Sequence, residues 1–115
     1  MVYEDGLEVE VGSRGRITVV CMADSLDTKE LQSQALLATP HSQFTHYPEV
    51  LHQTYCDSFG VTRGDIFYYD YGVVVMWGFS QKDLEDDILR IVDKVVEDPL
   101  DASEVQVDEF EYLYR

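Results

Sequence analysis

The chain has 115 residues and is strongly acidic, because 23 Asp and Glu against 8 Lys and Arg give a formal net charge of −15 at pH 7. A surface of this charge repels phosphate backbones and anionic lipid headgroups, so direct binding to nucleic acid and charge-driven membrane binding are not expected. The hydrophobic content of 45% is enough to build the core of one small domain, and the natural complement of the charge is a partner with a basic protein surface.

The start of the chain is an acidic lead-in over residues 1–15, and residues 16–115 form one predicted α+β domain. The lead-in, MVYEDGLEVEVGSRG, lacks the Arg-rich and acid-poor character of an organelle transit peptide. No membrane segment is predicted, because a membrane helix needs about 20 uninterrupted apolar residues. Cys21 and Cys56 are expected to be buried thiols rather than a disulfide.

The domain begins with a strand and a helix. Residues 16–22, RITVVCM, are rich in β-branched and apolar residues and predict a strand. A helix is predicted over residues 28–39, because Asp27 supplies an N-cap, Glu30 follows three positions later as in a capping box, and Pro40 ends the run.

A further strand and a hairpin are predicted in the middle of the chain. Residues 48–56 alternate as in a strand, with an uncertain register. The run DIFYYDYGVVVMWGFS at residues 65–80 contains two strands, 66–69 and 73–77, both rich in aromatic and β-branched residues. The Asp-Tyr-Gly sequence between them is typical of a tight turn and argues against a membrane helix.

The second helix is predicted over residues 81–97, with Ser80 as its N-cap and Pro99 beyond its end. One face is apolar and is expected to pack on the sheet; its members are Leu84, Ile88, Ile91, Val92 and Val95. The opposite face is charged, and faces of this kind are usually only solvated. Its acids are also a candidate docking face for a protein partner, and they are Asp83, Asp86, Asp87 and Asp93.

The last strand is predicted over residues 105–114. Phe110 and Tyr112 share one face and Val107 lies on the other, which predicts a β-bulge between the two halves of the strand. The elements follow in the order strand, helix, three strands, helix, strand. This order predicts an α+β fold of the split β-α-β, ferredoxin-like type, in which an antiparallel sheet carries two helices on one face.

No catalytic or metal-binding pattern emerges from the sequence. His41, His46, His52 and Cys56 follow one another at spacings of five, six and four residues, which match no common metal-ligand template. Carboxylates are too abundant for any pair of them to indicate acid-base catalysis, and no serine lies in a Gly-x-Ser-x-Gly sequence. We therefore expect no enzyme activity, no metal and no cofactor.

Residues 64–80, GDIFYYDYGVVVMWGFS, resemble the signature of the family founded by the fungal "required for meiotic nuclear division" proteins. This family includes a mitochondrial homologue in animals and the plant Retarded Root Growth proteins, and residues 110–112 resemble its next block. The signature positions in this chain are Asp65, Phe67, Tyr69, Tyr71, Gly72, Val74, Trp77 and Gly78.

The resemblance implies a non-catalytic scaffold or tether that supports mitochondrial gene expression, in particular translation, and through it growth and cell division. The implied partners are the mitochondrial ribosome or translation factors, and the implied location is the mitochondrion. Family members usually carry a second, helical part of the domain and a C-terminal membrane anchor. The chain is therefore expected to be the N-terminal part of a larger domain.

Two other functions remain open. An α+β domain of this kind could bind a small molecule or act as an enzyme, with the loop from His41 to His52 as a pocket wall. Alternatively, the aromatic last strand, which includes Tyr114, could pair at a sheet edge with a second copy, so that the domain forms a homo-oligomer.

Overall fold

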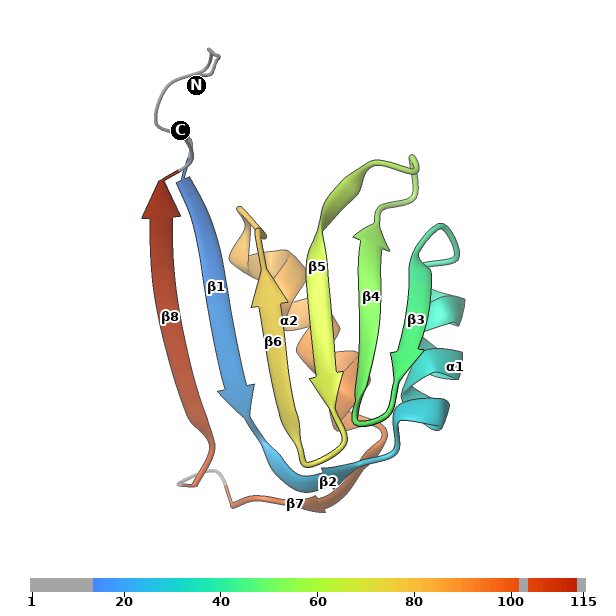
Figure 1. Ribbon diagram of the computed structural model, residues 1–115, viewed down its shortest axis with the longest axis vertical. Helices are drawn as coiled ribbons and strands as arrows, with labels where there is room; N and C mark the ends of the chain where they lie inside the picture. Colours follow the sequence, from blue (N-terminus) through green and yellow to red (C-terminus); the bar gives the residue numbers. More distant parts are fainter. Residues whose placement is uncertain (1–13, 102–103, 114–115) are drawn as a thin grey trace.

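A computed structural model describes residues 14–101 and 104–113 (Figure 1). Except for its last two residues, the predicted lead-in at residues 1–15 lies outside the described residues. The elements are, in chain order, β1 (Arg14–Cys21), β2 (Ala23–Leu26), α1 (Thr28–Ala38), β3 (Gln43–Tyr47), β4 (Val50–Cys56), β5 (Thr62–Tyr69), β6 (Val73–Trp77), α2 (Lys82–Asp93), β7 (Val96–Pro99) and β8 (Gln106–Leu113).

Six strands form one sheet in the order β3-β4-β5-β6-β1-β8, and β2 pairs with β7 in a separate two-stranded sheet. All neighbouring strands of the large sheet are antiparallel. Both helices lie on the same side of this sheet, α1 toward β3 and α2 behind the central strands (Figure 1). The prediction of a mixed α+β fold with an antiparallel sheet and two helices is therefore confirmed.

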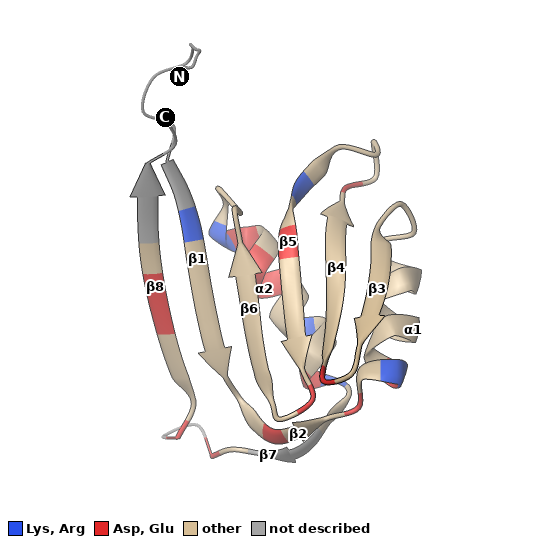
Figure 2. Ribbon diagram, in the orientation of Figure 1, with Lys and Arg blue, Asp and Glu red and all other residues tan. Residues whose placement is uncertain are grey.

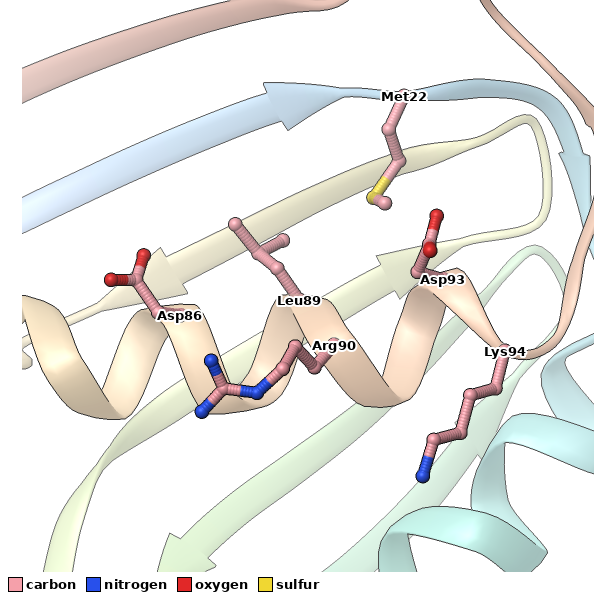
Figure 3. Close-up of a pocket in the computed structure, with 6 residues that line it drawn as sticks. All are labelled: Met22, Asp86, Leu89, Arg90, Asp93 and Lys94. Carbon is pink, nitrogen blue, oxygen red and sulfur yellow. The ribbon is translucent and has the colours of Figure 1, made fainter.

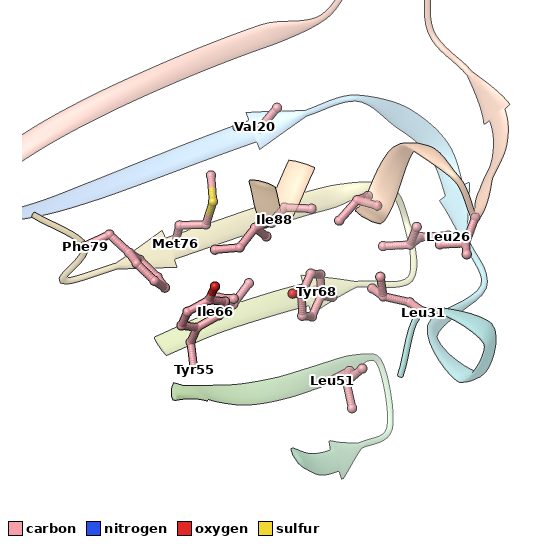
Figure 4. Close-up of a cluster of buried hydrophobic side chains, with 13 residues drawn as sticks. Val20, Leu26, Leu31, Leu51, Tyr55, Ile66, Tyr68, Met76, Phe79 and Ile88 are labelled. Carbon is pink, nitrogen blue, oxygen red and sulfur yellow. The ribbon is translucent and has the colours of Figure 1, made fainter. Parts of the chain in front are cut away.

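The core lies between the large sheet and the helices (Figure 4). Side chains alternate along each strand, so every second residue points toward the helices. On β5 and β6 the inward residues are Ile66, Tyr68, Val74 and Met76, each at most 2% exposed. The helices contribute Leu31 and Ala35 from α1 and Ile88 and Val92 from α2. The apolar face of the strands, with a period of two residues, thus packs against the apolar faces of the helices, with a period of 3.6 residues, in a single core.

The predicted hairpin is confirmed as β5 and β6, with Tyr69 paired to Val73 across a tight turn. The turn requires a glycine, because Gly72 has a φ of 91° and a Cβ there would lie 1.9 Å from the carbonyl oxygen of Ala23. The backbone N–H of Met22 donates to the carbonyl oxygen of Gly72 at 3.1 Å. The tip of the hairpin is therefore fixed against the link between β1 and β2.

The start of α1 agrees with the sequence. The Asp27 carboxylate accepts hydrogen bonds from the backbone N–H groups of Lys29 and Glu30, both at 3.1 Å. These bonds satisfy two of the free donors in the first turn of the helix. The helix ends at Ala38, one residue before its predicted end.

The second helix is shorter than predicted at both ends. Its N-cap is Gln81, which makes no side-chain capping bond, so the prediction of Ser80 as the N-cap is wrong. The backbone before α2 is held by Gly78, which has a φ of 89°, and by the buried Phe79. The helix therefore starts one residue later in the chain than predicted. The helix ends at Asp93, because the β-branched residues that follow lead into β7.

The segment before the β5–β6 hairpin contains two strands where the sequence predicts one. β3 and β4 form a hairpin closed by the pair Tyr47 and Val50, and the strand predicted at residues 48–56 starts only at Val50. Pro48 cannot donate a ladder hydrogen bond and therefore favours a turn. Phe44 holds β3 in place by packing against the core. The sheet thus has one more strand than predicted, and this strand, β3, lies at an edge.

The last strand is regular. β8 pairs with β1 in one continuous register, so the predicted bulge is wrong. Val107 and Phe110 lie on opposite faces because they are three positions apart in a regular strand. A register irregularity occurs instead between Tyr55 and Cys56 of β4. β8 is an edge strand, as the oligomer hypothesis requires, whereas Tyr114 lies outside the described residues.

Candidate interaction surfaces

The face of the large sheet that points away from α1 and α2 carries an apolar and aromatic surface, which we call the open face. Its members follow from the register, because directly paired residues share a face. They are Gln43, Thr54, Asp65, Trp77, Ile17 and Phe110 in one row, Thr45, His52, Phe67, Val75, Val19 and Asp108 in the next, and Tyr47, Val50, Tyr69, Val73, Cys21 and Gln106 in the third. Neither helix of the described residues covers this face (Figure 1).

Large side chains are exposed on the open face from one end of the sheet to the other. Trp77 is 45% exposed and Phe110 is 56% exposed, and Tyr47 on β3, which pairs with Val50, is 52% exposed. The three rows contain two acids, Asp65 and Asp108, and no Lys or Arg. A contiguous surface of this kind is typical of a protein interaction site.

His52 and Asp65 form a polar pair within the open face. Nε2 of His52 lies 2.9 Å from Oδ1 of Asp65, and the two side chains share a hydrogen bond. The His52 ring also stacks on Phe67, with 4.6 Å between ring centroids and 6° between ring planes. These contacts fix the position of the histidine and make it part of the surface between β4 and β5.

The signature residues divide between two roles. Those on the open face are Asp65, Phe67, Tyr69 and Trp77. Val74 is fully buried beneath the helices, Tyr71 and Gly72 lie in the turn, and Gly78 provides the positive φ that follows β6. Four of the eight signature residues therefore lie on the open face, and the other four lie in the core, in the turn or directly after β6.

The predicted docking acids are all exposed, and Figure 2 shows acidic residues along α2. Asp87 forms an ion pair with Arg90 one turn further along the helix. Asp86 and Asp93 instead line a groove beside the helix, whereas Asp83 and Asp87 do not contribute to its lining. The four acids predicted from the sequence thus separate into two pairs.

The groove, which we call the α2 groove, lies between α2 and the link that follows β1, and it has a volume of about 600 Å³. Figure 3 shows the Leu89 side chain projecting from α2 toward Met22, with Asp86 and Asp93 on either side of Leu89. Arg90 and Lys94 also line the groove, although they project away from Met22 (Figure 3). The groove therefore has an apolar centre flanked by two carboxylates and two basic side chains.

A buried charge that the sequence analysis missed lies where α2 meets β1. Glu85 is 3% exposed; its carboxylate accepts a hydrogen bond from the Thr18 hydroxyl at 2.9 Å and lies 3.2 Å from the Arg16 guanidinium. Burial raises the pKa of Glu85, and the Thr18 hydrogen bond and Arg16 charge oppose that shift. The signal in the sequence was that Glu85 precedes the buried Ile88 and Val92 by three and seven positions, on the same helix face.

The histidines do not converge on one site. His41 and Cys56 line a hollow of about 340 Å³ near the end of α1. His46, however, lies on β3 opposite Leu51, and His52 lies on the open face. Both cysteines are free thiols; Cys56 is buried as predicted, whereas Cys21 is only partly buried. In the part of the chain that the structure describes, no group of three or more His, Cys, Asp or Glu is arranged to hold a metal ion.

Comparison with known proteins gives one local similarity. A segment of 48 residues is 42% identical to Sporulation protein RMD1 of Saccharomyces cerevisiae. The segment is 42% of this chain and 11% of the yeast protein, so the similarity covers a small part of that protein's length. No family model and no solved structure matches the chain. Among residues 14–101 and 104–113, no helix has the length and apolar character needed to cross a membrane.

Proposed function

We propose that this chain is a non-catalytic protein-binding domain of the "required for meiotic nuclear division" family, and that it acts as a scaffold or tether in support of mitochondrial translation. The observation that carries the proposal is the exposure of aromatic side chains across the open face. Neither of the described helices covers this face.

The chemistry of the open face favours a macromolecular partner over a small ligand. Trp, Tyr and Phe are enriched in the cores of protein interfaces, where they provide most of the binding energy. Trp77, Phe110 and Tyr47 are spread over the sheet from β6 to both edges and are each about half exposed. A substrate site would instead be concave and would gather a few polar groups around one point.

The proposed family rests on the sequence signature and on the local similarity to the yeast sporulation protein. The mitochondrial setting is what the resemblance to that family implies. The net charge of −15 supports a basic partner, which is the character expected of ribosomal proteins. The ribosome or a translation factor is therefore the proposed partner, and the open face is its proposed contact.

The test measures which proteins are recovered with an affinity-tagged chain that a fused leader sequence directs into mitochondria. The native chain is compared with a variant that carries Trp77→Ser and Phe110→Ser, and mitochondrial ribosomal and translation proteins are quantified by mass spectrometry. We expect recovery to fall at least about tenfold in the variant, because truncation of an aromatic hot-spot residue costs about 2 kcal/mol or more.

The matched control is Phe59→Ser. Phe59 is 88% exposed in the loop between β4 and β5, and it is not a member of the open face. Equal recovery with the native chain and the double variant would contradict the proposal. Recovery of metabolic enzymes alone would favour a ligand-binding or enzymatic domain, and recovery of untagged copies of the chain alone would favour an oligomerisation module.

The fold invites a related proposal on topology, namely that β1, β5, β6 and β8 are the four strands of the predicted split β-α-β arrangement, with the β3–β4 hairpin inserted after α1. Support comes from the strand order β5-β6-β1-β8, in which β6 separates β1 from β5. An experimental structure with a different order of these strands would refute it.

A further inference from the structure

We propose that Asp65 and Trp77 form an arginine-binding subsite at the centre of the open face, and that the protein partner places an Arg side chain there among apolar residues. The inference rests on the proposed function, because it concerns the same face, and it adds the chemistry that the partner must bring. It does not depend on where in the cell the partner is found.

Asp65 lies well inside the open face, whereas the other acid of this face lies at its edge. β5, which carries Asp65, is the third of the six strands, and β8, which carries Asp108, is the last. Protein interfaces have an apolar core and a polar rim that water still reaches. A partner that covers the open face can therefore leave Asp108 in water, but it buries Asp65.

Aromatic side chains border Asp65 on the same face. Trp77 pairs directly with Asp65 across β5 and β6, and residues paired in this way have Cβ atoms about 5 Å apart. Phe67 follows Asp65 two positions along β5 and so points to the same side of the sheet. The Asp65 side chain is 44% exposed and Trp77 is 45% exposed. One side chain of a partner can therefore contact the carboxylate and the indole together.

The chain itself places no Lys or Arg beside Asp65 in the three rows of the open face. Arg63 is two positions away, but its guanidinium is held in the β4–β5 loop, 2.7 Å from the Asp57 carboxylate. His52 contacts Oδ1 of Asp65, and no donor among the described residues reaches Oδ2. Because a neutral imidazole supplies a hydrogen bond and no charge, the negative charge of Asp65 is left for a partner to balance.

A partner that buries Asp65 must bring a cation, because a buried carboxylate without a counter-charge is strongly destabilising. Arg suits this position better than Lys. Its guanidinium is planar and more weakly hydrated than an ammonium group, so it can stack on an aromatic ring while its N–H groups donate to a carboxylate. Exposed Trp77 and exposed Asp65 provide these two partners side by side.

The first experiment selects ligands for the purified full chain from a phage library of random peptides. Peptides that bind the native chain but not the variant with Trp77→Ser and Phe110→Ser are defined as open-face peptides. We expect Arg to be enriched in them at least about threefold over Lys, because only Arg combines stacking with planar donation to a carboxylate.

The second experiment tests whether that Arg contacts Asp65. Binding of a selected peptide is measured by fluorescence anisotropy, and the peptide is compared with a copy that has citrulline, a neutral analogue of similar shape, in place of Arg. Asp65→Asn keeps an oxygen that can accept from His52 and removes the charge. Asp24→Asn is the matched control, since Asp24 is exposed on β2, outside the large sheet.

We expect citrulline to weaken binding at least about tenfold on the native chain and on Asp24→Asn, but less than about threefold on Asp65→Asn, because the charge pair is then already lost. On a Trp77→Leu variant, which keeps an apolar side chain but loses the ring, the citrulline effect is expected to shrink by about threefold. Circular dichroism establishes that the variants remain folded.

Two results would overturn the subsite alone: open-face peptides without enrichment of Arg, or a citrulline effect of the same size on the native chain and on Asp65→Asn. Equal loss of that effect on Asp65→Asn and Asp24→Asn would show attraction by net charge and would also overturn it. A library that yields no open-face peptide would contradict the protein-binding role of the whole face, so the two failures are distinguishable.

Discussion

The guanidinium of Arg16 on β1 lies 3.2 Å from the carboxylate of Glu85 on α2 and 3.4 Å from that of Glu109 on β8. One cation thus joins the helix to two neighbouring strands. Glu85 is almost fully buried, and a buried carboxylate without a counter-charge is strongly destabilising. The position of α2 on the sheet therefore depends on this contact as well as on its apolar stripe.

Replacement of Arg16 by Met is expected to lower the free energy of unfolding at pH 7 by about 3 kcal/mol, because it leaves Glu85 without its nearest counter-charge. Urea unfolding followed by circular dichroism measures the change. Adding Glu85→Gln to Arg16→Met is expected to recover part of the loss, since the uncompensated charge is then gone. A loss below about 1 kcal/mol in the single variant would mean that the pair behaves like an exposed ion pair.

The stability of the native chain is expected to depend on the protonation of Glu85. Burial raises the pKa of this carboxyl above its ordinary value of 4.5, so the folded state holds the proton more tightly than the unfolded state. The contribution of Glu85 to stability is therefore complete below the ordinary pKa and is lost as the pH rises through the raised pKa. Glu85→Gln stays neutral and lacks this loss.

We therefore expect Glu85→Gln to gain stability relative to the native chain as the pH rises from about 4 to about 7. Thermal unfolding at a series of pH values checks this, and comparison of the two chains at each pH removes the contribution of the other carboxylates. If the variant instead loses relative stability over this range, the ion pair with Arg16 outweighs burial.

Gly72→Ala is expected to destabilise the fold severely, by more than about 3 kcal/mol, because the new Cβ would collide with the backbone of Ala23 in addition to the strain of a positive φ. The matched control is Gly60→Ala. Gly60 has a φ of 79° but no atom within 4 Å of the added Cβ, so the expected loss is about 1–2 kcal/mol. Equal losses in urea unfolding would show that the turn does not press against Ala23.

Replacing the two residues that the sequence predicts as N-caps is expected to have different effects on stability. Asp27→Ala is expected to destabilise the protein by about 1 kcal/mol, because it removes the acceptor of two N-terminal hydrogen bonds of α1. Ser80→Ala is expected to change the stability by less than about 0.5 kcal/mol, because α2 is capped at Gln81 and Ser80 is exposed. A larger effect at Ser80 than at Asp27, measured by urea unfolding, would contradict these helix boundaries.

Where signals are local, the sequence predicts the structure well. The cap at Asp27 and the hairpin around Gly72 both depend on residues within a few positions of one another, and both are found as predicted. The cap at Ser80 fails because Phe79, which precedes it, is anchored in a core built from distant segments. Tertiary packing there decides between two possible starts of the helix.

Long-range polar contacts leave little trace in the sequence. Gln53 is 1% exposed; its amide donates to the hydroxyls of Thr39 and Ser42 and accepts from that of Tyr68 at 2.7 Å. These partners lie 11 to 15 positions away, so no local pattern identifies them. Strand alternation likewise predicts that a sheet has two faces, but it does not predict which of them α1 and α2 cover.

The most direct test of the central claim is site-specific photo-crosslinking from the open face in mitochondria. A benzophenone amino acid replaces Phe110 in one sample and Phe59 in another, and the cross-linked proteins are identified by mass spectrometry. We predict adducts with mitochondrial ribosomal or translation proteins from position 110 that are absent from position 59. No adduct from position 110, or the same adducts from both positions, would contradict a scaffold that binds through its open face.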